Sequence, residues 1–118
     1  MKEGSKMKLA IIGSRSLTNV DIRKYLPEGV TEIVSGGARG VDTCAERYAK
    51  ANGIPFKCFR PNYSVYGRRA PLMRNLQIAA YSDEVLVFWD GESHGTDFTI
   101  KAFQAENKKT KIIICDVE

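Results

Sequence analysis

The chain has 118 residues, 43% of them hydrophobic, which is the size and composition of a single domain with one core. None of its apolar stretches approaches the length needed to cross a membrane, so the sequence predicts no membrane partner. The formal net charge of +4 is too small to identify a nucleic-acid-binding protein by itself.

The first residues are polar and charged, without the apolar segment of a signal peptide. We expect residues 1–7 to form a disordered tail and residues 8–118 to form one domain. Cys44, Cys58 and Cys115 have neither CxxC nor metal-ligand spacing, which is typical of a protein in a reducing cytoplasm. The expected location is cytoplasmic, and no metal site is expected.

Short apolar runs alternate with helix-like segments along the chain. The runs lack the two-residue alternation of half-exposed strands, as parallel strands buried on both faces do. The predicted strands cover about 8–12, 32–34, 55–59, 84–89 and 111–115. The predicted helices cover about 19–25, 41–51, 72–81 and 96–107, and Asn52-Gly53 ends the second of them.

Strands that alternate with helices predict a parallel sheet with helices on both faces. We expect a Rossmann-like three-layer α/β fold whose five strands, numbered along the chain, have the order 3-2-1-4-5. Strands two, one and four would then be neighbours, and glycine-bearing loops follow these three strands. In such sheets, ligands bind at the carboxyl ends of the strands, beside the point where the strand order reverses.

The three glycine-bearing loops are residues 13–16, 35–42 and 90–96. A glycine-rich turn between a strand and a helix exposes backbone N–H groups at the positive end of the helix dipole, where phosphate groups bind. The loops contain neither the Gly-Lys-Ser/Thr of a Walker A loop nor the dinucleotide GxGxxG pattern. The sequence therefore predicts a nucleotide-like ligand but not an ordinary NTPase or dehydrogenase.

In the second loop, Gly36 and Gly37 leave no side chain between the backbone and a ligand, and Gly40 lies where the helix begins. A tight turn that needs glycine for its geometry alone is the alternative. Arg15 and Arg39 are suited to hold phosphate oxygens, with surface ion pairs as the alternative.

Asp42 lies in the first turn of its helix, where it could cap the helix or accept hydrogen bonds from ribose hydroxyls. Ser93, Gly95 and Thr96 resemble another helix start, with Ser93 or Thr96 as the cap and free N–H groups that could bind phosphate. His94 has no triad or metal partners in the sequence, so we expect it to be exposed rather than catalytic.

Residues 57–74 contain one lysine and four arginines but no acid, a composition that attracts anions. A solvated, charged loop is the alternative. Within this stretch, residues 60–71 include two prolines, a glycine and the tyrosines Tyr63 and Tyr66, and we expect an irregular loop there.

Four motifs together resemble those of the SLOG superfamily, which takes in DprA/Smf proteins and LOG phosphoribohydrolases. They are Gly13-Ser14-Arg15, Ser35-Gly36-Gly37-Ala38-Arg39-Gly40-Val41-Asp42, Tyr66-Gly67 followed by Arg74-Asn75, and Ser93-x-Gly95-Thr96. The chain looks most like the small single-domain branch related to YspA and YpsA. The resemblance implies a Rossmann-like fold, a pocket for a nucleotide or an ADP-ribose-like ligand, and a place for Arg74 and Asn75 in that pocket.

The chain departs from the LOG hydrolases at one position. Those enzymes resemble one another in a Pro-Gly-Gly-x-Gly-Thr-x-x-Glu motif, and here Thr99 stands in place of the glutamate. Cleavage of an N-glycosidic bond needs a carboxylate near the anomeric carbon, and threonine is a poor substitute. An enzyme would have to recruit another carboxylate, and the candidates are Asp42, Asp90, Glu92 and Asp97.

The leading prediction is a cytoplasmic binding or sensor protein for a phosphate- and ribose-bearing ligand, without a separate cofactor. The predicted ligand-binding residues are Gly13, Ser14, Arg15, Ser35, Gly36, Gly37, Arg39, Gly40, Asp42, Arg74, Asn75, Ser93, Gly95 and Thr96. The alternatives are an enzyme of phosphoribohydrolase or deoxyribosyltransferase type and a single-stranded DNA-binding module.

The apolar faces of the third and fourth predicted helices are candidate contacts of a homodimer. The third helix carries Leu72, Leu76, Ala79 and Ala80 along one side. The fourth helix adds Phe98 and Phe103, and in a monomer one sheet would have to cover all of these side chains.

Overall fold

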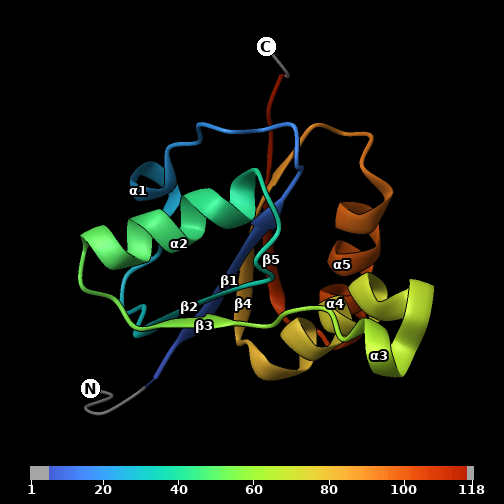
Figure 1. Cartoon of the computed structure of the whole chain (residues 1–118). Helices are drawn as coiled ribbons and strands as arrows, with labels where there is room; N and C mark the ends of the chain where they lie inside the picture. Colours follow the sequence, from blue (N-terminus) through green and yellow to red (C-terminus); the bar gives the residue numbers. More distant parts are fainter. Residues whose placement is uncertain (1–5, 117–118) are drawn as a thin grey trace.

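The computed structural model describes residues 6–116 and contains a five-stranded, all-parallel sheet (Figure 1). The strands are β1 (Lys8–Gly13), β2 (Glu32–Ser35), β3 (Phe56–Cys58), β4 (Glu84–Trp89) and β5 (Lys109–Ile114). They lie in the order β3-β2-β1-β4-β5, which confirms the predicted strand order and the α/β class.

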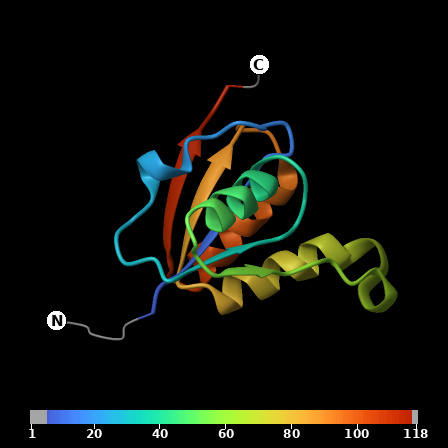
Figure 2. The ribbon, with the colours of Figure 1, turned by 60° about the vertical axis from the view of Figure 1, so that its left-hand side comes forward.

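Helices cover both faces of the sheet (Figures 1 and 2). They are α1 (Ile22–Tyr25), α2 (Val41–Ala51), α3 (Tyr63–Tyr66), the 3-10 helix η1 (Gly67–Arg69), α4 (Ala70–Tyr81) and α5 (His94–Ala105). The helices α1 and α2 pack on one face, and α4 and α5 lie together on the other.

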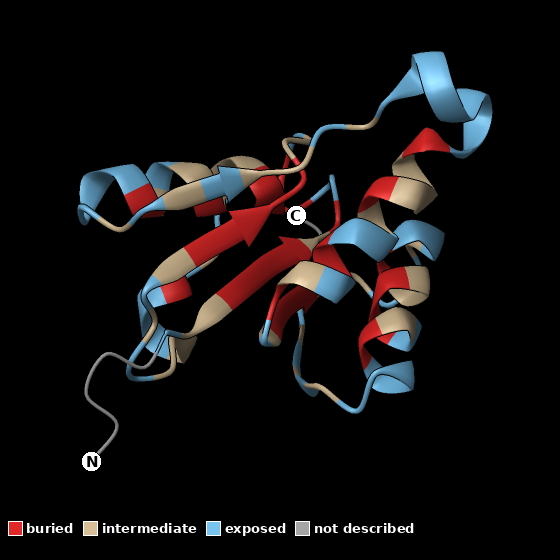
Figure 3. Cartoon of the chain, turned by 90° about the horizontal axis from the view of Figure 1, so that it is seen from below, coloured by how far each residue is buried: buried red, intermediate tan, exposed pale blue. Residues whose placement is uncertain are grey.

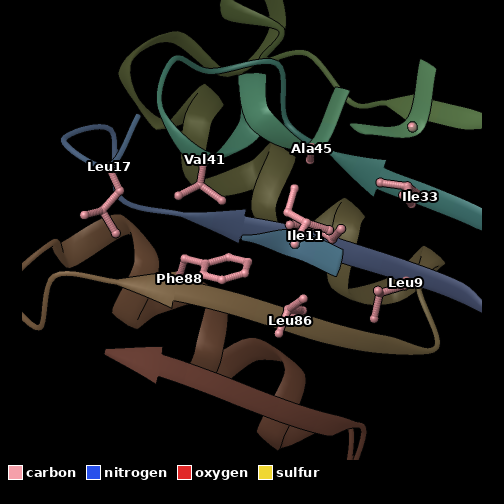
Figure 4. Packing of buried hydrophobic residues seen from close by; sticks show 10 residues of the cluster. Leu9, Ile11, Leu17, Ile33, Val41, Ala45, Leu86 and Phe88 are labelled. Carbon is pink, nitrogen blue, oxygen red and sulfur yellow. The ribbon is translucent and has the colours of Figure 1, made fainter. Parts of the chain in front are cut away.

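The central strands supply side chains to both halves of the core. On β4, Leu86 and Phe88 join the cluster beneath α2, while Val85 and Val87 join the cluster beneath α4 and α5. Figure 4 shows the first cluster, with Val41 of α2 lying over the sheet near Phe88. Because both faces of β4 are buried, its sequence is a continuous apolar run rather than an alternating one.

Two predicted segments differ from the structure. The helix expected at 19–25 is a single turn, α1, because Asp21 caps it and accepts a hydrogen bond from the amide of Lys24. The segment 60–71, expected to be irregular, instead forms α3, η1 and the first residues of α4. Asn62 begins this helical stretch by accepting a hydrogen bond from the amide of Val65.

The face that α4 turns toward the sheet also differs from the prediction. Leu76 and Ala80 are exposed, whereas the buried residues of this helix are Ala70, Arg74, Ile78 and Ala79. The helix therefore buries Arg74 and exposes Leu76, the opposite of what the apolar spacing predicts for these two residues. On α5, Phe103 is fully buried in the core of its own chain, so it offers nothing to a dimer.

Residues 1–5 of the expected tail lie outside the described residues. Met7 already belongs to the folded part, because its amide donates to the hydroxyl of Thr31 (2.8 Å) and its side chain packs against the first core cluster. Among residues 6–116, no helix is both long and apolar enough to span a bilayer.

Candidate functional site

The three glycine-bearing loops meet at the carboxyl edge of the sheet around a cavity of about 520 Å³. This volume lies within the range of small-molecule sites. The cavity is lined by Ile12, Gly13, Ser14, Arg15, Ser16, Ala38, Arg39, Asp42, Pro71, Leu72, Arg74, Asn75, Asp90, Ser93, Gly95, Thr96 and Thr99. The residues come from the ends of β1 and β4 and from α2, α4 and α5.

Most of the predicted ligand-binding residues line this cavity. They are Gly13, Ser14, Arg15, Arg39, Asp42, Arg74, Asn75, Ser93, Gly95 and Thr96. The other four, Ser35, Gly36, Gly37 and Gly40, do not line it. Ser35 is fully buried, and its hydroxyl donates to the carbonyl of Ile11 (2.7 Å), so it links β2 to β1.

The glycines of the second loop are required by contacts within the protein. A Cβ on Gly36 would overlap the guanidinium of Arg74, and one on Gly37 would lie 2.8 Å from the thiol of Cys58. Gly40 has φ +79°, and a Cβ there would lie 2.6 Å from the backbone of Ser14. The geometric alternative stated for these loops therefore accounts for all three glycines.

Arg74 is a buried cation at one wall of the cavity, with 6% of its surface exposed. Its Nη1 donates to the carbonyls of Gly36 and Phe59, and its Nε donates to the side-chain oxygen of Asn75 (2.7 Å). No carboxylate within residues 6–116 forms an ion pair with it. Burial lowers the pKa of its guanidinium, against the opposing effect of the nearby Asp42 charge.

Asp42 is the buried carboxylate of the cavity, with an exposed fraction of 6%. One of its oxygens accepts a hydrogen bond from the amide of Ala38 (3.2 Å). Burial raises the pKa of the Asp42 carboxyl, and this effect outweighs the Ala38 hydrogen bond and the charge of Arg74, which both lower it. A carboxylate held in this way accepts hydrogen bonds from hydroxyl groups.

Asp90 is a structural tie between the first and third loops. Its carboxylate accepts hydrogen bonds from the amides of Glu92 and Ser93, both at 2.9 Å, and from the hydroxyl of Ser16 (3.1 Å). The two amides hold the pKa of this carboxyl far below its usual range. The hydroxyl of Ser14 completes the tie by accepting from the amide of Asp90 (3.0 Å).

Two helices that contribute residues to the cavity lining, α2 and α5, begin without a side-chain cap. Gly40 precedes α2 and has no side chain, and Ser93 precedes α5 but makes no capping hydrogen bond. The Ser93 hydroxyl is instead directed to Asp90 and Ser14, at 3.1 Å from each. Ser93 is therefore the N-cap residue of α5, as expected, but its side chain makes no capping hydrogen bond, and Thr96 lies within the helix.

Gly95 differs from the glycines of the first two loops. A Cβ built on it would meet nothing within 4 Å, and its φ is not positive. Neither packing nor backbone conformation therefore requires glycine here, at a helical position where alanine is more stable. The effect of the glycine is to leave space over the exposed N–H groups at the start of α5.

The exposed arginines at the cavity have no partner of opposite charge among the described residues. Arg15 and Arg39 form no ion pair with any residue in the described range 6–116, so the ion-pair alternative is not observed for either. His94 is exposed and lies outside the cavity lining. Thr99 lines the cavity, and its hydroxyl donates to the carbonyl of Gly95 (3.0 Å).

Sequence reasoning missed several lining residues. Ile12, Pro71 and Leu72 line the cavity from outside the four motifs, and Ala38 lines it from within the second motif although it was not predicted to bind. Within residues 6–116, no group of three or more His, Cys, Asp or Glu side chains could hold a metal ion.

Comparisons with protein-family models, curated proteins and solved structures find no match for this chain. The interpretation of the cavity therefore rests on its geometry and chemistry.

Proposed function

We propose that this chain is a binding or sensor protein for a nucleotide-like ligand that carries phosphate and ribose, such as a nucleoside monophosphate or an ADP-ribose derivative. The observation that carries the proposal is that two helices lining one cavity, α2 and α5, begin without a side-chain cap, beside arginines that form no ion pair within residues 6–116. Helix N-termini and arginine forks both favour anions, and phosphate is the anion that suits them best.

The two ends of such a ligand have separate partners in the cavity. A phosphate at the start of α5 would accept hydrogen bonds from the amides near Gly95 and Thr96, with Arg15 supplying charge. Ribose hydroxyls would donate to Asp42, and Arg74 would donate to an oxygen of the sugar or phosphate through Nη2, the guanidinium nitrogen that makes no hydrogen bond within residues 6–116.

We also propose membership of the SLOG superfamily, on the motifs described above and the strand order they accompany. Binding without turnover is favoured by Thr99, whose hydroxyl is already bonded to Gly95 at a position where a LOG hydrolase has its glutamate. Of the carboxylates that an N-glycosidic enzyme would need, Glu92 and Asp97 lie outside the cavity lining and Asp90 is bonded to the loop. An N-glycosidic enzyme would therefore have to use Asp42 as its catalytic carboxylate.

Thermal denaturation against a panel of ligands tests the proposal. The panel is AMP, ADP, ATP, ADP-ribose, NAD and cyclic nucleotides. A ligand present at a hundred times its dissociation constant stabilises the fold by about 2.7 kcal/mol, which raises Tm by several degrees. We expect a shift with one class of nucleotide, and a flat response to the whole panel would contradict the proposal.

A matched pair of arginine variants locates the site. Arg39 and Arg47 are both exposed, but only Arg39 lines the cavity. Arg39→Ala should lower the affinity for the nucleotide by about tenfold, as expected when a charged hydrogen bond is lost. Arg47→Ala should leave this affinity unchanged. Chromatography of the incubated nucleotide should show no free base. Release of base that Asp42→Asn abolishes would favour the enzyme instead.

A further inference from the structure

Residues 62–69, which we call the arm, project from the body of the domain between β3 and α4. Figure 2 shows α3 at the far end of this projection, and Figure 3 shows the same segment as exposed ribbon beyond the two layers of helices. The arm comprises Asn62, α3 and η1, and α3 packs mainly on η1 and α4, its own neighbours in the chain. It contributes nothing to either core cluster.

The arm has a defined local structure although it buries no residue. Asn62 caps its first turn, and Gly67 ends that turn with φ +57° in open space, a conformation that favours glycine. Apolar burial is the usual source of helix stability in proteins, and here it is absent. The sequence therefore specifies a shaped protrusion whose side chains are presented to solvent.

Aromatic rings and positive charge are interleaved on this protrusion. Tyr63 is 61% exposed and Tyr66 is 37% exposed. Arg68 and Arg69 follow directly and are also exposed, with Arg60 at the base of the arm. None of these three arginines forms an ion pair within the described part of the chain, and residues 47–82 contain no acid at all.

We propose that the arm is an interaction surface for single-stranded nucleic acid. Exposed arginines bind backbone phosphates, and exposed tyrosine rings stack on bases, whichever base is present. Stacking requires bases that are not already paired and stacked in a duplex, so the surface favours single strands. A second copy of the chain fits less well, because pairing two arms would bring Arg68 and Arg69 of both copies together without an acid to neutralise them.

This proposal is independent of the nucleotide proposed for the cavity. None of the residues 62–69 lines that cavity. Among them, Tyr63 lies near enough to Arg74 of the cavity wall to influence its charge, so the Arg68→Glu/Arg69→Glu variant is the one that alters the arm separately from the cavity. A free mononucleotide in excess should therefore not displace a strand bound to the arm.

Fluorescence anisotropy with the full chain and labelled oligo-dT or oligo-U of about 15 nucleotides tests the proposal. Tyr63→Ala/Tyr66→Ala should weaken binding by at least about tenfold, because each lost stack costs a factor of that order. Arg68→Glu/Arg69→Glu should also weaken binding, and it should reduce the slope of log affinity against log salt by about 1.4, the value for two phosphate contacts on a single strand.

The control is Lys109→Glu/Lys111→Glu, which changes the net charge by the same amount at exposed positions on β5. This variant should bind nearly as well as the parent. No strand binding by the parent, equal loss in the control, or equal affinity for a duplex of the same length would each overturn the proposal. So would sedimentation showing that the arm variants abolish a dimer without altering strand binding, because the arm would then be a surface for a second copy.

Discussion

The first two glycine loops and the third look alike in sequence but differ physically. The first two are interlocked: Gly40 packs against the backbone of Ser14, and the amide of Val41 donates to the Ser14 carbonyl at 3.4 Å. In the third loop, Gly91 and Gly95 both have open space around their Cβ positions. Glycine in the interlocked loops is therefore explained by packing, whereas packing does not explain Gly95, which we propose leaves room for a ligand.

A glycine-rich loop is therefore not by itself evidence of a binding site. A loop glycine supports a ligand site when neither a neighbouring atom nor a positive φ accounts for it. By that criterion the third loop carries more of the functional inference than the second, although the second has more glycines.

The largest expected effect is that of Gly13→Ala in the interlocked loops. A Cβ there would overlap the carbonyl oxygen of Phe88 and lie 2.8 Å from Val41, so the central strands β1 and β4 would have to separate. We expect a loss of roughly 3 kcal/mol or more in urea-induced unfolding. Gly91→Ala, which meets no atom but has φ +85°, should cost only about 1–2 kcal/mol. Equal losses would contradict the comparison.

Arg74→Ala should have the next largest effect, about 2–4 kcal/mol, because it removes the donor to the buried carbonyls of Gly36 and Phe59 and the cation nearest Asp42. Chemical denaturation measures this loss. Arg47→Ala, at an exposed arginine, should stay within about 0.5 kcal/mol of the parent. A similarly small loss for Arg74→Ala would show that its burial contributes no stability.

Asp42→Asn separates stability from binding. Because burial raises the pKa of Asp42, folding favours its neutral form, so the parent loses stability as the pH rises from below 3.8, the ordinary value, through the folded pKa. Asparagine has no such loss. The variant should therefore have a higher Tm than the parent at pH 7, and this advantage should shrink below pH 3.8.

Asp42→Asn should also lower the affinity for the nucleotide by about tenfold, because it replaces a charged acceptor for ribose hydroxyls. Calorimetric titration with a ribonucleotide and its 2′-deoxy analogue measures this effect. A variant that binds as tightly as the parent would remove Asp42 from the proposed site.

The smallest expected effect on stability is that of Gly95→Ala. Alanine is the better helix former, so the substitution should stabilise the fold by up to about 1 kcal/mol. If Gly95 leaves room for a phosphate, the added methyl group should at the same time lower the affinity for the ligand. Thermal denaturation with and without nucleotide measures both effects, and unchanged affinity would show that the ligand does not approach this position.

The sheet and the position of the cavity at its carboxyl edge could be predicted from the amino-acid sequence. Continuous apolar runs such as Val85–Phe88 predict strands buried on both faces, and their alternation with helices predicts a parallel sheet. The observed strand order was expected because it places the strands that precede the glycine loops side by side. The same order brings the three loops together, and ten of the fourteen predicted residues line the cavity. These features follow from local patterns, which is why they were predictable.

The buried face of α4 and the surroundings of each glycine depend on the tertiary structure and could not be predicted from the sequence. Apolar spacing selects Leu76 for the core, but Arg74 is buried because its partners, the carbonyls of Gly36 and Phe59, lie 38 and 15 residues away in the chain. Likewise, a Cβ on Gly13 would meet the backbone of a neighbouring strand, whereas a Cβ on Gly95 would meet nothing within 4 Å. Contacts between distant segments leave no local pattern, so only the folded chain distinguishes a glycine that packing requires from one that leaves room for a ligand.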